Sequence, residues 1–321
     1  MRSLLSQTQI ATVETFEAAG VLSRELVTCF VGRVGLFRNQ PGDILLEDAD
    51  LVLCIGFDSV EYDPESWNAE QKLKIIHLDA NYADIGRCYR PEYELVGDIA
   101  ATLIQLSKHL QAGPLKNPAL ISELRNTLNA GIKKGSQLTG FPIHPLRFIA
   151  DLQSLVDDNT TVISDVGSHY MWLARHLYCY RPHHLLFSNG QQTLGVALPW
   201  AMAASMVRPE EKIISISGDG GFLFSAMELE TAVRHKCNIV HCVWRDGSYD
   251  MVGSQQQMKY GRRTAVEFGK IDLVKFAESF GATGFSLESV DELLPTLQKA
   301  FKINGPVLID GKYSTNPSIQ Q

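Results

Sequence analysis

Residues 212–222 read KIISISGDGGF, an apolar run rich in β-branched residues that leads into a glycine-rich turn. The run Lys212–Gly218 predicts a buried strand, and the apolar spacing over Phe222–His235 predicts a helix after the turn. The glycines let a ligand approach the backbone, and the helix start offers free N–H groups that suit a phosphate. Asp219 adds an oxygen donor suited to Mg²⁺. Taken alone, a plain strand-to-helix turn with Asp219 as helix cap explains these residues equally well.

A second carboxylate follows at the end of the next predicted strand. Asp246 closes the run Asn238–Asp246, 27 residues after Asp219. The intervening helix and strand form one crossover, which places the ends of the two parallel strands side by side. Two carboxylates and the carbonyl of Ser248 could hold a Mg²⁺ ion that bridges a diphosphate. The alternative is that Asp246 only forms the turn before Gly247.

Strand-like runs alternate with helical patterns along most of the chain. The predicted strands are Ala11–Phe16, Leu51–Phe57, Lys74–Ala80, Tyr93–Asp98, Thr161–Gly167, His184–Asn189, Lys212–Gly218, Asn238–Asp246, Thr283–Leu287 and Pro306–Asp310. The predicted helices are Ile99–Gln111, His144–Val156, Ser168–Tyr178, Thr193–Val207, Phe222–His235, Ile271–Phe280 and Asp291–Phe301. This alternation predicts an α/β fold with two doubly wound, mostly parallel sheets covered by helices.

Breaks in the pattern divide the chain. Residues 112–117 (AGPLKN) and the stretch 133–145, rich in Gly and Pro, interrupt the alternation. We therefore expect one domain over 1–111, a linker over 112–144 that contains a helix, and a second domain over 145–321.

Composition excludes several classes of protein. Of 321 residues, 45% are hydrophobic, and 29 basic residues face 36 acidic ones for a net charge of −7. This balance excludes a disordered chain and gives no support to nucleic-acid binding. The six cysteines are scattered without a CxxC motif, which favours a reducing cytoplasm. No apolar run reaches the roughly 18 residues of a membrane span, so we expect no membrane partner.

The motifs together resemble the catabolic, FAD-independent acetolactate synthases of the thiamine diphosphate (ThDP) enzyme family. The GDGGF turn and Asp246-Gly247-Ser248-Tyr249 are similar to the family's diphosphate–Mg²⁺ signature. Further matching segments are GRVGLFRNQPGDILLEDADLVL (32–53), SNGQQTLGVALPWA (188–201), GDGGFLFSAMELETAV (218–233), DMVGSQQQMKYGR (250–262) and EFGKIDLVKFAESFGATGF (267–285). The resemblance implies that 1–111 is part of a middle domain and that 145–321 is a diphosphate- and Mg²⁺-binding domain with the ThDP-binding fold.

The resemblance also implies the roles of individual residues. The Mg²⁺ ligands would be the side chains of Asp219 and Asp246 and the carbonyl of Ser248. The residues that bind ThDP would be Gly167, Ser168, His169, Gln191, Gln192, Leu194, Gly218, Asp219, Gly220, Gly221, Tyr249, Met251, Val252 and Gln255. The family usually has Gly at the position of Ser248 and Met at that of Leu194.

The implied reaction is the ThDP- and Mg²⁺-dependent decarboxylation of pyruvate and its condensation with a second pyruvate to 2-acetolactate, by a homodimer or homotetramer without FAD. This is the transfer of an acetaldehyde unit (EC 2.2.1.6 type), used in acetoin biosynthesis. The family's activating glutamate belongs to a first domain with no counterpart here, so we expect a fragment that is inactive alone and assign no catalytic residue. The alternative is a non-catalytic ThDP–Mg²⁺ binding module or a remnant of a related enzyme.

Overall fold

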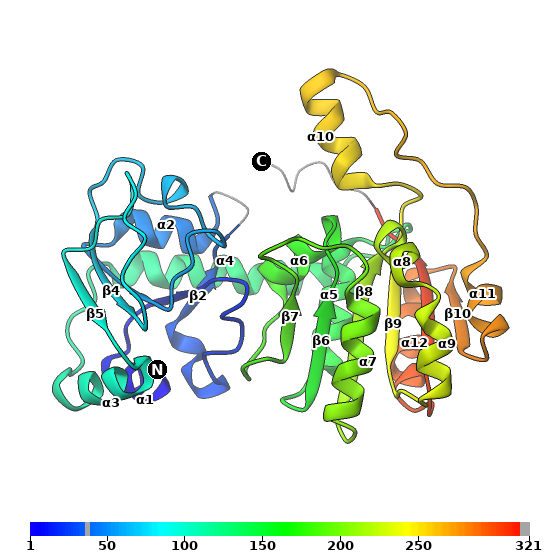
Figure 1. Cartoon of the computed structure of the whole chain (residues 1–321), viewed down its shortest axis with the longest axis horizontal. Coiled ribbons are helices and arrows are strands. Elements are labelled where there is room, and N and C mark those ends of the chain that lie inside the picture. The colour runs from blue at the N-terminus through cyan, green and yellow to red at the C-terminus, as the bar shows by residue number, and fades with distance from the viewer. Residues whose placement is uncertain (36–38, 315–321) are drawn as a thin grey trace. The chain divides into compact units, whose positions relative to one another are not determined.

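The computed structural model describes residues 1–35 and 39–314. Residues 36–38, within the matching segment 32–53, and the last seven residues of the expected second domain lie outside this description. The chain forms two compact units (Figure 1). The smaller comprises Met1–Asn129 and Tyr180–Pro182, and the larger comprises Ala130–Cys179 and the residues from His183 onward.

The larger unit is built on a six-stranded parallel sheet in the order β10-β11-β9-β8-β6-β7. Its strands are β6 (Thr160–Ser164), β7 (Leu185–Phe187), β8 (Lys212–Gly218), β9 (Val240–Arg245), β10 (Thr283–Leu287) and β11 (Val307–Lys312). The central strands β6, β8 and β9 are buried almost throughout, as expected of a parallel sheet covered on both faces. This confirms the prediction of an α/β fold with parallel sheets flanked by helices.

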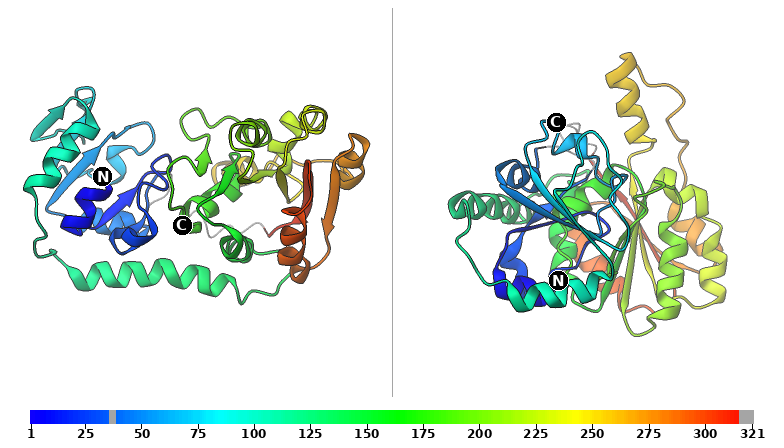
Figure 2. Two further views of the ribbon diagram at one scale, coloured as in Figure 1. Left: turned by 90° about the horizontal axis from the view of Figure 1, so that it is seen from below. Right: turned by 60° about the vertical axis from the view of Figure 1, so that its left-hand side comes forward.

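Helices cover both faces of this sheet, with α7, α8 and α9 on one face and α5 and α12 on the other (Figure 2). The helices of the larger unit are α5 (Pro145–Leu155), α6 (Ser168–His176), α7 (Ala197–Val207), α8 (Asp219–Ser225), α9 (Glu228–Arg234), α10 (Asp250–Tyr260), α11 (Leu273–Ser279) and α12 (Leu293–Ala300), with a 3₁₀ turn at Val290–Glu292. No helix among the described residues is both long enough and apolar enough to cross a membrane.

The helix predicted over Phe222–His235 is two helices, α8 and α9. Between them, the N–H groups of Leu229 and Glu230 donate to the carbonyls three residues earlier, those of Ala226 and Met227. This spacing is tighter than that of an α-helix and interrupts it. The first helix also begins sooner than predicted, at Asp219, so the carboxylate lies in its first turn.

The smaller unit has a three-stranded parallel sheet, β3-β4-β5, and a separate parallel pair, β1 and β2. Its strands are β1 (Thr12–Glu14), β2 (Phe30–Arg33), β3 (Leu51–Ile55), β4 (Lys74–Asp79) and β5 (Tyr93–Val96). Its helices are α1 (Arg2–Thr8), α2 (Pro41–Asp48), α3 (Ile99–His109) and most of α4 (Pro118–Gly135), with 3₁₀ turns at Arg24–Cys29 and Pro64–Ser66. A core around Val34, Tyr62, Trp67 and Ile75 holds these elements together.

Candidate functional site

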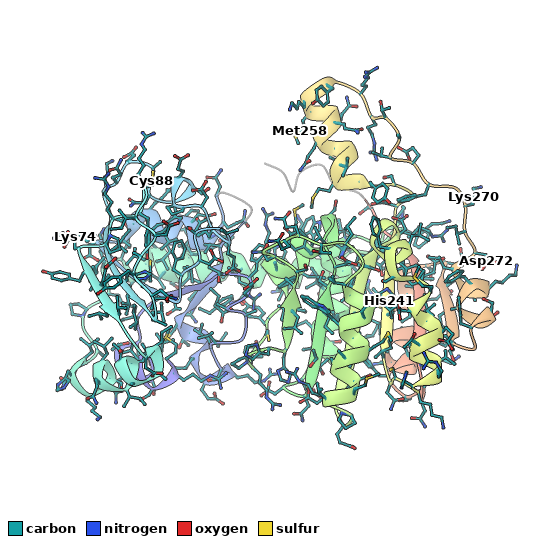
Figure 3. The ribbon with its side chains drawn as sticks, viewed as in Figure 1. Lys74, Cys88, His241, Met258, Lys270 and Asp272 are labelled. Atoms are coloured by element: carbon teal, nitrogen blue, oxygen red, sulfur yellow. The ribbon has the colours of Figure 1, made fainter. Side chains whose placement is uncertain are left out.

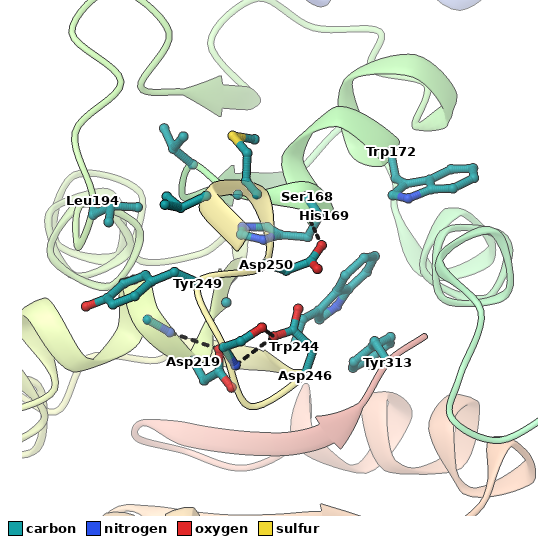
Figure 4. Close-up of a pocket in the computed structure, with 18 of the residues that line it drawn as sticks. Ser168, His169, Trp172, Leu194, Asp219, Trp244, Asp246, Tyr249, Asp250 and Tyr313 are labelled. Carbon is teal, nitrogen blue, oxygen red and sulfur yellow. Dashed lines mark hydrogen bonds between the residues drawn. The ribbon is translucent and has the colours of Figure 1, made fainter. Parts of the chain in front are cut away.

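A cavity of about 240 Å³ opens in the larger unit where β6, β8 and β9 end (Figure 4). Its walls include the segments that follow these strands, 166–169 after β6, 218–221 after β8 and 246–252 after β9. Ligands of open parallel sheets bind at this edge, because the loops after neighbouring strands converge there. The cavity is therefore the candidate ligand site.

The cavity brings together all but two of the predicted site residues. Those that line it are Gly167, Ser168, His169, Gln192, Leu194, Gly218, Asp219, Gly220, Gly221, Asp246, Ser248, Tyr249, Met251 and Val252. Gln191 and Gln255 do not line it, and both are exposed. Gln255 lies on α10, which stands away from the sheet (Figure 1), so in this chain its side chain does not reach the cavity.

Asp219 and Asp246 lie side by side because their strands pair directly, with Gly218 opposite Trp244. Backbone N–H groups orient both carboxylates. Asp219 accepts hydrogen bonds from Gly220 (3.0 Å) and Gly247 (2.7 Å), and Asp246 accepts one from Ser248 (2.9 Å).

The electrostatics of the pair favour a cation. Burial raises the pKa of Asp219. Desolvation by the surrounding protein, together with the negative charges of Asp219 and Asp250, raises the pKa of Asp246 to about 7. Asp219 is buried, whereas Asp246 is exposed. Because the two negative charges repel each other, a divalent ion between them would stabilise the pair. Among the described residues no three His, Cys, Asp or Glu side chains form a metal site, so such an ion would also need carbonyl, phosphate or water oxygens.

The turn after β9 accepts a serine where the family usually has glycine. The left-handed position in this turn is Gly247, with φ 80°, and Ser248 is not among the residues with positive φ. The Ser248 side chain therefore causes no backbone strain. Its hydroxyl lies 3.2 Å from Asp246 Oδ1 and accepts a 2.8 Å hydrogen bond from Arg263.

Close packing leaves no room for side chains at Gly220 and Gly221, the last two glycines of the GDGG turn. A Cβ atom at Gly220 would lie 2.6 Å from the ring of Tyr249, and one at Gly221 would lie 2.9 Å from Asp165 Oδ2. Glycine is therefore needed at both positions so that the backbone can pack against Tyr249 and Asp165.

The ring of His169 presents, at the cavity wall, a polar atom that is unpaired within the described part of the chain. The side chain is 3% exposed, and its Nε2 atom has no hydrogen-bond partner among the described residues. Burial lowers the pKa of His169 to about 3, and its ring also makes a hydrogen bond to the backbone of Asp165. A neutral, buried imidazole nitrogen at a cavity wall needs a polar partner, which a bound ligand or its water can supply.

Sequence reasoning missed one end of the cavity. Trp244 and Tyr313 stack there with ring centroids 4.4 Å apart, and Trp172 lies nearby on α6 (Figure 4). Trp172 is 8% exposed and lines the cavity. Other lining residues not predicted are Pro145, Val166, Asp250 and Ser314.

Residues 247–268, called the flap here, carry one wall of the cavity and include α10. At its base, Tyr249 N–H donates to the Val266 carbonyl and Phe268 N–H to the Gly247 carbonyl, each at 2.8 Å. The two arms of the flap are thus paired where they leave the sheet. The cavity-lining residues Tyr249, Met251 and Val252 follow directly on one arm.

Comparison with known proteins agrees with this arrangement. The family model "Thiamine pyrophosphate enzyme, C-terminal TPP binding domain" matches residues 165–311, and "Thiamine pyrophosphate enzyme, central domain" matches residues 1–106. The chain belongs to the thiamine pyrophosphate (ThDP) enzyme family, which confirms the predicted membership.

Within this family the chain is similar to acetolactate synthases. It is 51% identical to "Acetolactate synthase" of Bacillus subtilis (strain 168) over 316 residues, 97% of this chain and 55% of that protein. It is 45% identical to "Acetolactate synthase, catabolic" of Raoultella terrigena over 304 residues, 93% of this chain and 54% of that protein. The chain therefore spans about half the length of these relatives.

Proposed function

We propose that the chain is the ThDP- and Mg²⁺-binding part of an acetolactate synthase, which forms 2-acetolactate and CO₂ from two molecules of pyruvate. The observation that carries the proposal is the pair of neighbouring carboxylates, Asp219 and Asp246, at adjacent strand ends, in a chain 51% identical to an acetolactate synthase. We further propose a cytoplasmic enzyme of acetoin biosynthesis that needs no FAD. All six cysteines are free thiols, which is consistent with a reducing compartment.

The two carboxylates and the carbonyl of Ser248 would hold Mg²⁺. The diphosphate would lie against Gly167–His169 and Gly218–Gly221, which line the cavity. Gln192, Leu194, Tyr249, Met251 and Val252 would contact the rest of the cofactor. When bound, ThDP supplies a nucleophilic carbon for the ketone group of pyruvate.

The residues of this chain would bind and orient the cofactor and exclude water. Backbone N–H groups fix both carboxylates before any ion arrives, so the site needs little rearrangement. Leu194, a bulky apolar side chain in the cavity wall, would pack against the bound cofactor. Met251 and Val252 would cover the reacting end of the cofactor. Their apolar side chains would keep water out, which strengthens electrostatic contacts in the site.

We assign the domains as a partial middle domain over 1–111, a linker over 112–144 and the diphosphate domain over 145–321. The matches to the central and C-terminal family models support this assignment. The activating glutamate would come from the part of the relatives that this chain does not match. The 321 residues alone would then bind ThDP without turnover, and none of them is proposed as a catalytic residue.

We also propose that the complete enzyme is a homo-oligomer. On α7, an apolar face exposes Trp200 (38%), Met206 (52%) and Val207 (77%) to solvent. A helix that is apolar on all sides is usually covered on all sides. A second copy of the enzyme would cover this face.

Calorimetric titration of the chain with ThDP, with and without Mg²⁺, tests the binding. We expect binding that requires Mg²⁺ and is lost in Asp246→Ala. Fusion to the unmatched N-terminal part of the Bacillus subtilis relative tests the activity. Acetolactate from the fusion but not from the chain alone would support the proposal. Binding by the fusion without turnover would favour the alternative, a non-catalytic ThDP–Mg²⁺ module.

A further inference from the structure

Arg263 contacts both arms of the flap. Its Nη2 atom donates a 2.8 Å hydrogen bond to Ser248 Oγ, and its Nη1 atom lies 3.7 Å from Asp250 Oδ1. Its Nε atom lies 3.5 Å from Glu267 Oε1. Ser248 and Asp250 belong to the outgoing arm, and Glu267 belongs to the returning arm. One guanidinium group therefore connects the two arms at the base of the flap.

Asp250 extends this connection to the body of the larger unit. Its Oδ2 atom accepts a 2.7 Å hydrogen bond from Ser168 Oγ, at the start of α6 (Figure 4). The Asp250 side chain is 12% exposed, whereas that of Arg263 is 34% exposed. A carboxylate this buried needs its partners, because an unpaired buried charge is costly. Arg263 and Ser168 are partners of Asp250 on opposite sides.

The start of α10 also packs directly against the guanidinium group. A Cβ atom at Gly253 would lie 2.6 to 2.7 Å from the Nε, Cζ and Nη2 atoms of Arg263. Gly253 is the one buried residue of α10, and Met258 further along is 65% exposed (Figure 3). Beyond Arg263, side-chain hydrogen bonds between Gln256 and the backbone of Thr264 join α10 to the returning arm. The helix thus has few contacts other than those at the flap base.

We propose that Arg263 is a positioning residue that holds the base of the flap against the cavity, so that Tyr249, Met251 and Val252 keep their places in its wall. Arginine suits this role, because its planar group of five donors can serve several acceptors at once, whereas the ammonium group of lysine cannot. By holding this wall, Arg263 would raise the affinity of the cavity for its ligand. The proposal has two parts. The first, that Arg263 holds the base of the flap, does not depend on the proposed function. The second, that it raises the affinity for the ligand, rests on the proposed function.

Hydrogen–deuterium exchange of the cofactor-free chain tests the first part. In Arg263→Met we expect amide exchange over 250–260 to accelerate about three- to tenfold, because the variant loses the contacts with Ser248, Asp250 and Glu267. The effect should be modest, since Arg263 is partly exposed and such contacts contribute little. Exchange in β6, β8 and β9 should not change. Arg262→Met, which removes the neighbouring exposed arginine, should behave as wild type. Unchanged exchange over 250–260 in Arg263→Met would overturn the proposal.

Salt provides a test that needs no variant. Because ionic contacts of exposed groups are screened, 1 M NaCl should accelerate exchange over 250–260 in the wild type and much less in Arg263→Met. An equal response in both would contradict the role of Arg263.

Calorimetry with ThDP and Mg²⁺ tests the second part. Arg263→Met should weaken binding about three- to tenfold, and Arg263→Lys should lie between it and the wild type. Equal affinities in the wild type and Arg263→Met would overturn this part. A wild-type chain that binds no ThDP would refute the proposed function, whereas the exchange result would still decide the role of Arg263.

Discussion

The carboxylate of Asp219 accepts a 2.7 Å hydrogen bond from the backbone N–H of Gly247, which joins the turn after β8 to the turn after β9. The bond depends on the backbone of Gly247, which has φ 80°. Both the position of Asp219 and the shape of the Asp246 turn therefore depend on a glycine at 247.

Replacing Gly247 should destabilise the larger unit without steric overlap. No atom lies within 4 Å of a Cβ placed there, so Gly247→Ala meets only the strain of a positive φ. We expect a loss of about 1–2 kcal/mol in the free energy of unfolding. Gly113→Ala is the matched control, because it also meets no atom and has no positive φ. Chemical denaturation measures both, and equal stabilities of the two variants would contradict the strain argument.

The metal assignment predicts a selective loss in Asp219→Asn. An amide oxygen can still accept the hydrogen bond from Gly247, so the fold should persist, but the charge that attracts the cation is gone. We expect ThDP binding at limiting Mg²⁺ to weaken at least about tenfold, the effect of some 1.4 kcal/mol. Glu278→Gln removes an exposed carboxylate elsewhere and should bind normally. Normal binding by Asp219→Asn in calorimetry would refute the assignment.

Gly220→Ala should disturb the wall formed by Tyr249. The added methyl group would lie 2.6 Å from the Tyr249 ring, which packs edge-on against Phe268 with centroids 4.5 Å apart. Overpacking of this kind costs about 1–3 kcal/mol. Thermal unfolding should show the loss, and Tyr249→Ala should cost less in the Gly220→Ala background than in the wild type. Additive effects of the two substitutions would mean that the clash is relieved elsewhere.

Asp165 should make stability depend on pH. It is 1% exposed and accepts hydrogen bonds from Val166 (2.9 Å) and Gly195 (2.8 Å), yet burial raises its pKa to about 6. Between pH 4 and 6 the folded protein keeps a proton that the unfolded chain has lost. Asp165 therefore ionises less readily in the folded protein than in the unfolded chain. As a result, its contribution to the free energy of unfolding falls as pH rises through this window.

Asp165→Asn isolates this effect because the variant has no group that titrates at 165. The unfolding free energy of the wild type minus that of the variant should fall by about 2 kcal/mol between pH 4 and 7. Urea denaturation at several pH values measures it. A difference that stays constant or rises with pH would contradict the raised pKa.

The adjacency of Asp219 and Asp246 was predictable, because a parallel crossover allows few alternatives. The strands of both units other than β2 were likewise visible as apolar runs. By contrast, β2 and α2 were missed. Helix α2 lies within QPGDILLED, where no helix was predicted. The signal was nevertheless present, since Pro41 occupies the first helical position and Asp43 accepts a 2.8 Å hydrogen bond from Gln40 N–H.

The aromatic end of the cavity could not be found from local patterns. Tyr313 reaches the site because β11 inserts between β10 and β9, a strand order that apolar spacing does not encode. Trp244 directly precedes Arg245-Asp246, so its nearness to the site was a detectable hint. The role of Arg263 depends on a turn returning from α10 to the sheet, and no periodicity predicts such a return.

Most of the cavity wall comes from segments that follow β6, β8 and β9, three strands that are far apart in sequence. The site is therefore intact only in the folded unit. No local segment contains the site, so it forms only once β6, β8 and β9 have paired. A ligand that binds only the folded form stabilises it by mass action, by about 2.7 kcal/mol when its free concentration is a hundred times its Kd. A higher concentration of such a ligand would then raise the fraction of chains whose larger unit is folded. The free energy of binding would not act directly on the smaller unit.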